Sequence, residues 1–141
     1  MGRAAQMGRF LVWLGVTGFW AVGCGPRVPV VPEGTPVSYA AHLEPLVLAR
    51  CLGCHNADEA KARLDLEQGK GYGNLVGRSS TQVPSMLLGQ PGSPEGSYLW
   101  LKLQHTTERG EGMPRTLIGA RKLRADELEL YRRWIEDGAL P

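Results

Sequence analysis

Apolar positions along the chain fall into a few short groups, and each group predicts one helix. Leu43, Leu46 and Val47 recur at helical spacing, so we expect a short helix over 43–50. Pro45 suits the first turn of this helix, because a residue there donates no hydrogen bond within the helix. The residues that follow position 50 are therefore presented from the end of a helix.

Two further helices are predicted in the second half of the chain. Residues 98–103 are apolar on most sides and predict a buried helix, for which Ser93-Pro94-Glu95 has the residue types of N-cap, N1 and N2. The last helix is expected over 125–137, with acidic residues in its first turn and Gly138 just after its end. The inner face of this last helix consists of Leu128, Tyr131, Trp134 and Ile135.

Residues 69–96 are rich in Gly, Ser and Pro, with only two short apolar groups among them. A structureless loop of this length is unusual in a compact domain. The pattern predicts an all-α chain in which long loops join the helices.

The first 23 residues have the layout of a bacterial secretory signal peptide. Arg3 and Arg9 form a basic start, residues 10–22 are apolar, and small residues precede Cys24. A membrane span needs about 20 apolar residues, so this stretch is short for one, and an uncleaved N-terminal anchor is the alternative. Ala21-Val22-Gly23-Cys24 also resembles the lipobox of bacterial lipoproteins, in which the cysteine is acylated.

A proline-rich segment follows this signal. Prolines recur every three or four residues from Pro26 to Pro36, which favours an extended polyproline conformation. We therefore predict a signal peptide at 1–23, a lipidated cysteine and tether at 24–37, and one domain at 38–141.

Cys51-Leu52-Gly53-Cys54-His55 carries the most specific chemistry in the chain. It matches C-x-x-C-H, the attachment pattern of a c-type haem, in which both thiols bind the porphyrin and the histidine binds its iron. A thioredoxin-like dithiol and half of a zinc site are alternatives for C-x-x-C alone. However, no second C-x-x-C is present, and a helix rather than a strand is predicted before Cys51. One covalent haem is therefore the expected cofactor, and it gives the long loops a large apolar surface to pack against.

Met113 is the predicted second axial ligand of the iron. Pro114 fixes its own φ and favours an extended Met113, so the pair presents a thioether on a stiff segment. Thioether sulfur is a soft ligand that favours ferrous iron. Met86 is expected to be core packing, and His42 lies too close to the attachment helix to cross the ring. His105 would give bis-histidine ligation instead.

Cysteine usage and charge fit an exported protein. With Cys51 and Cys54 committed to haem, Cys24 is the odd thiol, and lipidation gives it a use. Removal of the two signal arginines leaves 14 basic against 14 acidic residues. No basic cluster is interleaved with aromatic residues, so no nucleic-acid partner is expected. Residues 121–124 are a solvated turn or part of a docking surface for an acidic redox partner.

Further short sequences occur in a fixed order with these features. They are Pro45-Leu46, Arg50-Cys51-Leu52-Gly53-Cys54-His55, Leu64-Asp65-Leu66, Gln90-Pro91-Gly92-Ser93-Pro94, Ser97-Tyr98-Leu99, Met113-Pro114 and Trp134-Ile135-Glu136-Asp137-Gly138-Ala139. In this order they resemble a class I monohaem cytochrome c and, more narrowly, the planctomycete-type cytochrome c domain family. The resemblance covers about residues 38–141.

This resemblance implies a cytochrome c-like, all-α fold around one haem. It also implies that Cys51 and Cys54 carry the thioethers, that His55 is the proximal ligand and that Met113 is the distal ligand. Arg124 departs from the family, which usually has a Ser or Thr cap before the last helix.

Three hypotheses for function follow. The first is an electron carrier, tethered to a membrane of the bacterial cell envelope by lipid on Cys24 and facing the periplasm, whose partners are unidentified redox proteins. The second is a haem sensor or a haem subunit of a larger redox enzyme, in which Met113 leaves to admit a ligand. The third is a lipid-anchored interaction module whose haem is mainly a folding core. No Ser/His/Asp set, carboxylate pair or phosphate loop indicates an enzyme.

Overall fold

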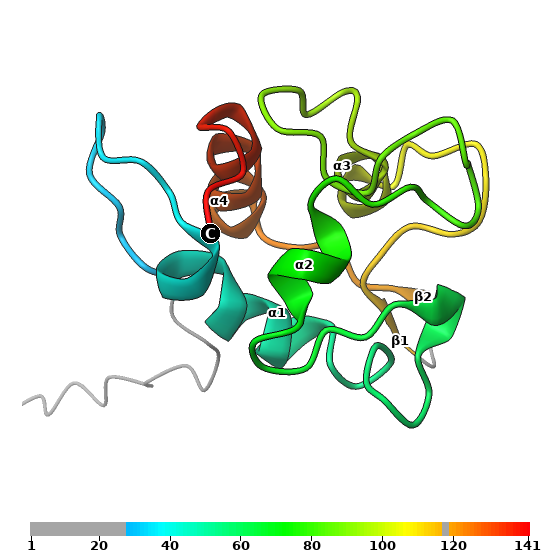
Figure 1. The fold of residues 1–141 in the computed structure, drawn as a ribbon. Coiled ribbons are helices and arrows are strands. Elements are labelled where there is room, and N and C mark those ends of the chain that lie inside the picture. The colour runs from blue at the N-terminus through cyan, green and yellow to red at the C-terminus, as the bar shows by residue number, and fades with distance from the viewer. Residues whose placement is uncertain (1–27, 117–118) are drawn as a thin grey trace, which may run out of the picture.

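Short helices joined by long loops make up the part of the chain that the computed structural model describes, residues 28–116 and 119–141 (Figure 1). The prediction of a helical chain is confirmed, with one antiparallel pair of two-residue strands added. The elements in order are the π-helix η1 (Tyr39–Leu43), α1 (Glu44–Arg50), the 3-10 helix η2 (Lys61–Arg63), α2 (Gly71–Leu75), α3 (Tyr98–Gln104), β1 (Arg115–Thr116), β2 (Gly119–Ala120) and α4 (Ala125–Glu136).

Helix α1 forms where the apolar spacing predicted it. Pro45 lies in its first turn, and Leu46 and Val47 are buried on the face that continues from Leu43. The π-helical turn η1 leads directly into α1 and was not predicted. The chain therefore reaches Cys51 from a helix that is anchored to the core on one side.

Helix α3 begins later than predicted. Its N-cap is Ser97, and Ser93 and Pro94 instead form a turn before it. In this turn the Pro94 carbonyl accepts the Ser97 N–H at 2.9 Å, and Ser93 Oγ accepts the Gly96 N–H at 3.1 Å. The prediction of a helix start at Ser93-Pro94-Glu95 is wrong, because the Ser93 hydroxyl closes this turn instead of capping a helix.

Helix α4 matches its predicted range within one residue, and Gly138 follows it in the left-handed region at φ +98°. Arg124 is the N-cap, and its N–H donates to Glu127 Oε2 at 2.8 Å. A carboxylate three residues into the helix thus binds the N-cap backbone, as in a capping box. Leu128 is half-buried, and the buried face of the helix consists of Glu127, Leu130, Tyr131, Trp134 and Ile135.

Trp134 joins the two ends of the described domain. Its side chain is fully buried and packs against the Tyr39 ring, with the ring centroids 5.7 Å apart. The Trp134 indole N–H donates to the Leu140 carbonyl at 2.8 Å, and the Tyr39 N–H donates to the same oxygen at 2.9 Å. Figure 1 shows α4 beside η1 and the C-terminus. Helix α4 therefore organises both ends of the domain.

Residues 28–37 pack against α4 instead of extending away from the domain as a tether. Val31 and Val37 are buried in the core. The Arg133 guanidinium donates to the carbonyls of Val31 at 2.8 Å and of Pro32 and Thr35 at 3.0 Å. Within the segment the Thr35 N–H donates to the Pro32 carbonyl at 3.2 Å, so residues 32–35 form a turn and not the extended polyproline conformation that was predicted. The prediction of a tether at 24–37 is therefore corrected for residues 28–37, whereas residues 24–27 lie outside the described residues.

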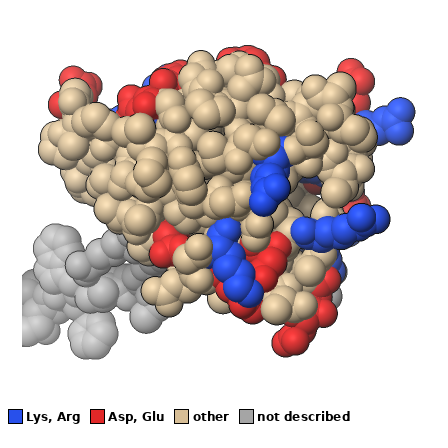
Figure 2. Space-filling view, viewed as in Figure 1, with Lys and Arg blue, Asp and Glu red and all other residues tan. Residues whose placement is uncertain are grey.

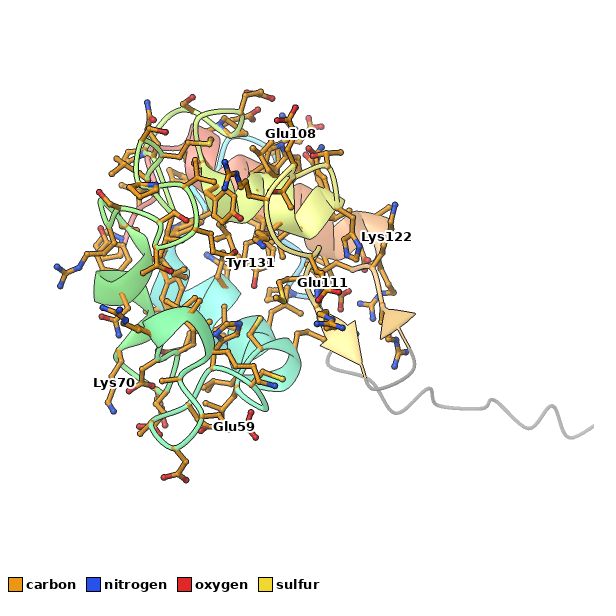
Figure 3. All side chains as sticks on the ribbon, turned by 90° about the vertical axis from the view of Figure 1, so that its right-hand side faces the viewer. Glu59, Lys70, Glu108, Glu111, Lys122 and Tyr131 are labelled. Atoms are coloured by element: carbon orange, nitrogen blue, oxygen red, sulfur yellow. The ribbon has the colours of Figure 1, made fainter. Side chains whose placement is uncertain are left out.

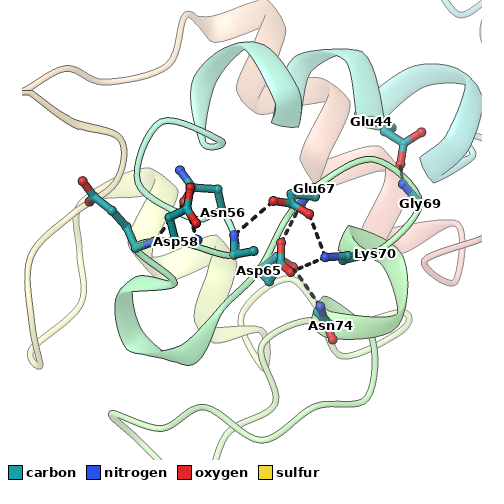
Figure 4. Close-up of polar contacts among 10 residues, drawn as sticks. Glu44, Asn56, Asp58, Asp65, Glu67, Gly69, Lys70 and Asn74 are labelled. Carbon is teal, nitrogen blue, oxygen red and sulfur yellow. Dashed lines mark hydrogen bonds and ion pairs between the residues drawn. The ribbon is translucent and has the colours of Figure 1, made fainter.

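Polar contacts shape the loop between η2 and α2, as Figure 4 shows. Lys70 Nζ donates to Asp65 Oδ2 at 2.8 Å and to Glu67 Oε2 at 2.7 Å. Glu44 Oε1 accepts the Gly69 N–H at 2.7 Å, which ties this loop to the start of α1. Helix α2 follows directly, inside the stretch that was predicted to be structureless.

One buried ion pair connects α1 to α4. Arg50 donates to Glu127 Oε1 from Nε at 3.1 Å and from Nη2 at 2.7 Å. The Glu127 side chain is 1% exposed and that of Arg50 20% exposed. A buried carboxylate depends on such a partner, because its own water shell has been removed.

We predict that Glu127→Gln lowers the free energy of unfolding by about 2 kcal/mol, because the Arg50 guanidinium loses its carboxylate partner in a largely buried place. Glu136→Gln is the matched control, since its exposed ion pair with Arg132 is worth less than about 1 kcal/mol. Denaturant unfolding of both variants measures the difference. Equal effects of the two substitutions would contradict the role assigned to the buried pair.

Candidate functional site

A cavity of about 740 Å³ opens between α1, α2, α3 and the loop that leads into β1. Cys51, Cys54, His55 and Met113 all line it. Sites for cofactors usually measure about 300–1,000 Å³. The structure therefore brings the four residues that were predicted to bind haem to one cavity of cofactor size.

The lining of this cavity combines apolar and cationic side chains. Its leucines are Leu64, Leu66, Leu75, Leu88, Leu99 and Leu103. Its cationic residues are Arg50, Lys61, Arg63, Arg78, Lys102 and Arg115, and no Asp or Glu of the described chain lines it. Figure 2 shows Lys and Arg side chains beside the hollow on this face. Such a lining suits a large apolar ligand that carries negative charge.

The backbone around C-x-x-C-H continues the path of α1 as a hydrogen-bonded turn. The Cys51 N–H donates to the Val47 carbonyl at 2.8 Å. The Cys51 carbonyl then accepts the N–H of Cys54 at 3.1 Å and that of His55 at 3.0 Å. A tight turn of this kind places residues three and four apart on the same side. Both thiols and the imidazole consequently reach one wall of the cavity.

His55 is held in the tautomer that an iron ligand needs. Its Nδ1 donates to the Lys61 carbonyl at 3.1 Å, so the proton lies on Nδ1 and the Nε2 lone pair is free to bind a metal. Burial lowers the pKa of His55 below its ordinary value, and hydrogen bonds to backbone carbonyls oppose this only in part. The neutral imidazole, which is the metal-binding form, is therefore favoured at neutral pH.

The Cys51 thiol is in surroundings that disfavour its thiolate. Burial raises the pKa of Cys51 to about 12, and a hydrogen bond with the Tyr131 side chain lowers it only in part. Figure 3 shows Tyr131 inside the molecule, where α4 faces the other helices. A redox dithiol reacts as its thiolate, so these surroundings disfavour the thioredoxin-like alternative. Residues 28–116 and 119–141 also contain no group of three or more His, Cys, Asp and Glu side chains that could hold a metal ion.

Met113 lines the cavity from the loop between α3 and β1. Its N–H donates to the Lys102 carbonyl at 2.9 Å, which fixes the loop to the end of α3. The side chain is half-buried, and the Met113–Pro114 peptide bond is cis. A thioether and an imidazole thus line one cavity from segments far apart in the sequence.

The three rival ligands do not line this cavity. Met86 borders a separate, smaller cavity. His42 Nδ1 accepts the Ser38 N–H at 3.0 Å within η1. His105 Nε2 donates to the Met113 carbonyl at 3.0 Å, so the ring of His105 supports the Met113 loop. Of the four candidates for the second axial ligand, Met113 is therefore the one that lines the cavity.

Cys24 and the predicted signal peptide lie outside the described residues. Within residues 28–116 and 119–141, no helix is long and apolar enough to cross a membrane.

Comparison with known proteins gives no relative of this chain. No protein-family model matches it, and searches of curated proteins and of solved structures find no similar protein.

Sequence reasoning missed two features of the site. The cationic side chains are scattered from position 50 to position 115, so no local pattern marks them. The glycine before Met113 is the second: a Cβ at Gly112 would overlap the His105 ring. The close approach of this backbone to His105 requires a residue with no side chain.

Gly112→Ala is expected to lower the free energy of unfolding by about 2 kcal/mol, since the added methyl group pushes the Met113 loop away from His105. Gly73→Ala is the control: it lies in α2, and an added Cβ meets nothing within 4 Å. That change should be neutral or stabilising by about 0.5 kcal/mol, because alanine favours a helix. Denaturant unfolding separates the two, and a fully stable Gly112→Ala would contradict the packing described.

Proposed function

We propose that the protein is a c-type cytochrome that transfers single electrons through one haem in the 740 Å³ cavity. Cys51 and Cys54 would bind the porphyrin covalently, and His55 and Met113 would be the axial ligands of the iron. The domain would then be a cytochrome c-like arrangement of helices and loops around this haem.

One observation carries the proposal: all the groups that a c-type haem needs line the same cavity. Cys51, Cys54 and His55 come from the turn after α1, whereas Met113 comes from the loop before β1. Residues from two separate segments meet at one place only because the fold brings them together. A chance C-x-x-C-H in an unrelated domain would have no reason to share a cavity with a methionine.

The rest of the cavity lining also suits the porphyrin ring and the propionates of a haem. Leucines suit the porphyrin faces, and cationic side chains suit its two propionates. Among the ion pairs of the described residues, none includes Arg63, Arg78 or Lys102 of this lining. The Lys102 ammonium already donates to two backbone carbonyls, so Arg63 and Arg78 are the best placed cations to bind a carboxylate group from a ligand.

Each residue has a role that follows from its contacts. The bond to the Lys61 carbonyl orients the His55 ring and keeps its Nε2 available. The soft sulfur of Met113 would stabilise the ferrous state and raise the reduction potential. A bound haem supplies an iron that changes oxidation state by one electron. If His55 and Met113 both bound that iron, no ligand would need to leave during electron transfer.

The contacts of Met113 favour a carrier over a sensor. Its N–H and its carbonyl both take part in hydrogen bonds to α3 or its C-cap residue, His105. These bonds keep the Met113 backbone beside the cavity, so the side chain stays within reach of a bound haem, as a permanent ligand requires. For location, we propose lipidation of Cys24 and attachment to a membrane of the bacterial cell envelope, on the sequence of residues 1–24 alone. The partners would be unidentified redox proteins.

Covalent attachment is tested on the full chain, exported in a bacterial host that attaches haem c. The wild-type protein should keep haem stain on a denaturing gel. Cys51→Ala or Cys54→Ala should weaken the stain, since one thioether is lost, and the double variant should abolish it. A wild-type chain without stain, or a double variant with full stain, would refute the proposal.

Axial ligation is tested with Met113→Ala. Covalent haem should survive, because the turn at 51–55 is unchanged. The sulfur-to-iron charge-transfer absorption of the oxidised protein should disappear and the reduction potential should fall, because any replacement ligand is a harder donor.

Met86→Leu is the matched methionine control, as a nearly volume-conserving change outside the cavity. It should keep the absorption band and the potential of the wild type. If Met113→Ala keeps both as well, another residue is the ligand.

A further inference from the structure

Lys102 is the only buried lysine or arginine in the described part of the chain, with 6% of its surface exposed. It lies in the last turn of α3 and lines the cavity. Burial of an ammonium group is costly unless its donors find partners inside the protein. The partners of the Lys102 ammonium therefore indicate which part of the structure it stabilises.

The partners of the Lys102 ammonium belong to the loop that carries Met113. Its Nζ donates to the Glu111 carbonyl at 3.0 Å and to the Arg109 carbonyl at 3.2 Å. The same Nζ lies 5.0 Å from the centre of the Tyr98 ring, within the range of a cation–π contact. In Figure 3 Glu111 lies next to β1, on the loop between α3 and that strand.

The backbone of Lys102 contacts the same loop. Its carbonyl accepts the Met113 N–H at 2.9 Å. Tyr98, one turn earlier on α3, donates from its hydroxyl to the Arg109 carbonyl at 2.6 Å. Helix α3 thus binds the loop at residues 109, 111 and 113. Lys102 makes a hydrogen bond to the backbone of each of these three residues.

We propose that Lys102 is a positioning residue, whose ammonium fixes the loop over residues 105–113 and thereby holds the Met113 sulfur in the cavity. This inference rests on the proposed function, in which that sulfur binds haem iron. Lys102 touches loop carbonyls rather than the ligand atom, so it acts through the backbone.

The magnitude follows from the type of bond. The hydrogen bonds from the Lys102 ammonium are part-buried, and a hydrogen bond from a charged donor changes an equilibrium by about tenfold. Without the ammonium, two carbonyls lose a partner and the loop samples positions in which Met113 is away from the cavity. A competing ligand should then bind the iron about tenfold more tightly or better.

The test uses the full-length, haem-loaded protein and imidazole as the competing ligand. Lys102→Leu should keep its covalent haem, should bind imidazole in the oxidised state about tenfold more tightly than the wild type, and should show a weaker sulfur-to-iron absorption band. Lys70→Leu is the matched control, because that lysine is exposed and binds Asp65 and Glu67 on another loop. It should bind imidazole as the wild type does.

Amide hydrogen exchange provides a readout that does not depend on iron. Exchange of the Met113 segment should accelerate in Lys102→Leu, whereas exchange in α1 and α4 should stay as in the wild type. Should Lys102→Leu fail to fold, Tyr98→Phe replaces it, since it removes the bond to the Arg109 carbonyl but keeps the ring. It should shift both readouts in the same direction by a smaller factor.

Two results separate the failure of this inference from the failure of the proposed function. Wild-type imidazole affinity and wild-type exchange in Lys102→Leu, in a protein that carries haem, would overturn the role of Lys102. A wild-type protein that carries no covalent haem would overturn the proposed function, and with it the ligand role of Met113. The exchange comparison would then still decide whether Lys102 holds the loop.

Discussion

The contact between Arg50 and Glu127 determines where the turn at 51–55 lies. Arg50 is the last residue of α1 and directly precedes Cys51, while Glu127 belongs to the first turn of α4. The Glu127 carboxylate also accepts the Arg124 N–H. One buried side chain therefore caps the N-terminus of α4 and binds the last residue of α1. Trp134 then ties α4 to η1 and to the C-terminus. The first wall of the cavity is positioned through these contacts.

The second wall depends on α3 rather than on α4. The loop that carries Met113 has no helix of its own, and it is held through the backbone and side chains of α3 and of His105. Between the two walls, leucines and cationic side chains line a cavity without a carboxylate from the described chain. This lining disfavours hard cations such as calcium and magnesium, which need oxygen ligands, and it is consistent with the amphiphilic anion that we propose.

Local sequence patterns correctly predicted those elements whose conformation depends on adjacent residues. The apolar spacing of α1 and α4 and the C-x-x-C-H turn are properties of a few adjacent positions, and the structure has both helices where they were expected. Helix α2 was missed because its sequence, with Gly71 and Gly73, has low helix propensity, so tertiary packing decides its conformation. Ser93 and Ser97 are equally good N-cap residues by type, and only the fold selects Ser97. The docking of residues 28–37 depends on Arg133, about a hundred positions away, and no local pattern reports such a partner.

The central claim is that His55 and Met113, which line one cavity from separate segments of the chain, would both bind the iron of one haem. X-ray absorption at the iron edge, measured on the reduced full-length protein, reports the donor atoms directly. We expect a single sulfur neighbour beside the nitrogen donors, because a thioether completes the coordination of a haem that already has a histidine ligand. An iron surrounded by nitrogen alone, or a preparation that holds no iron, would contradict this account.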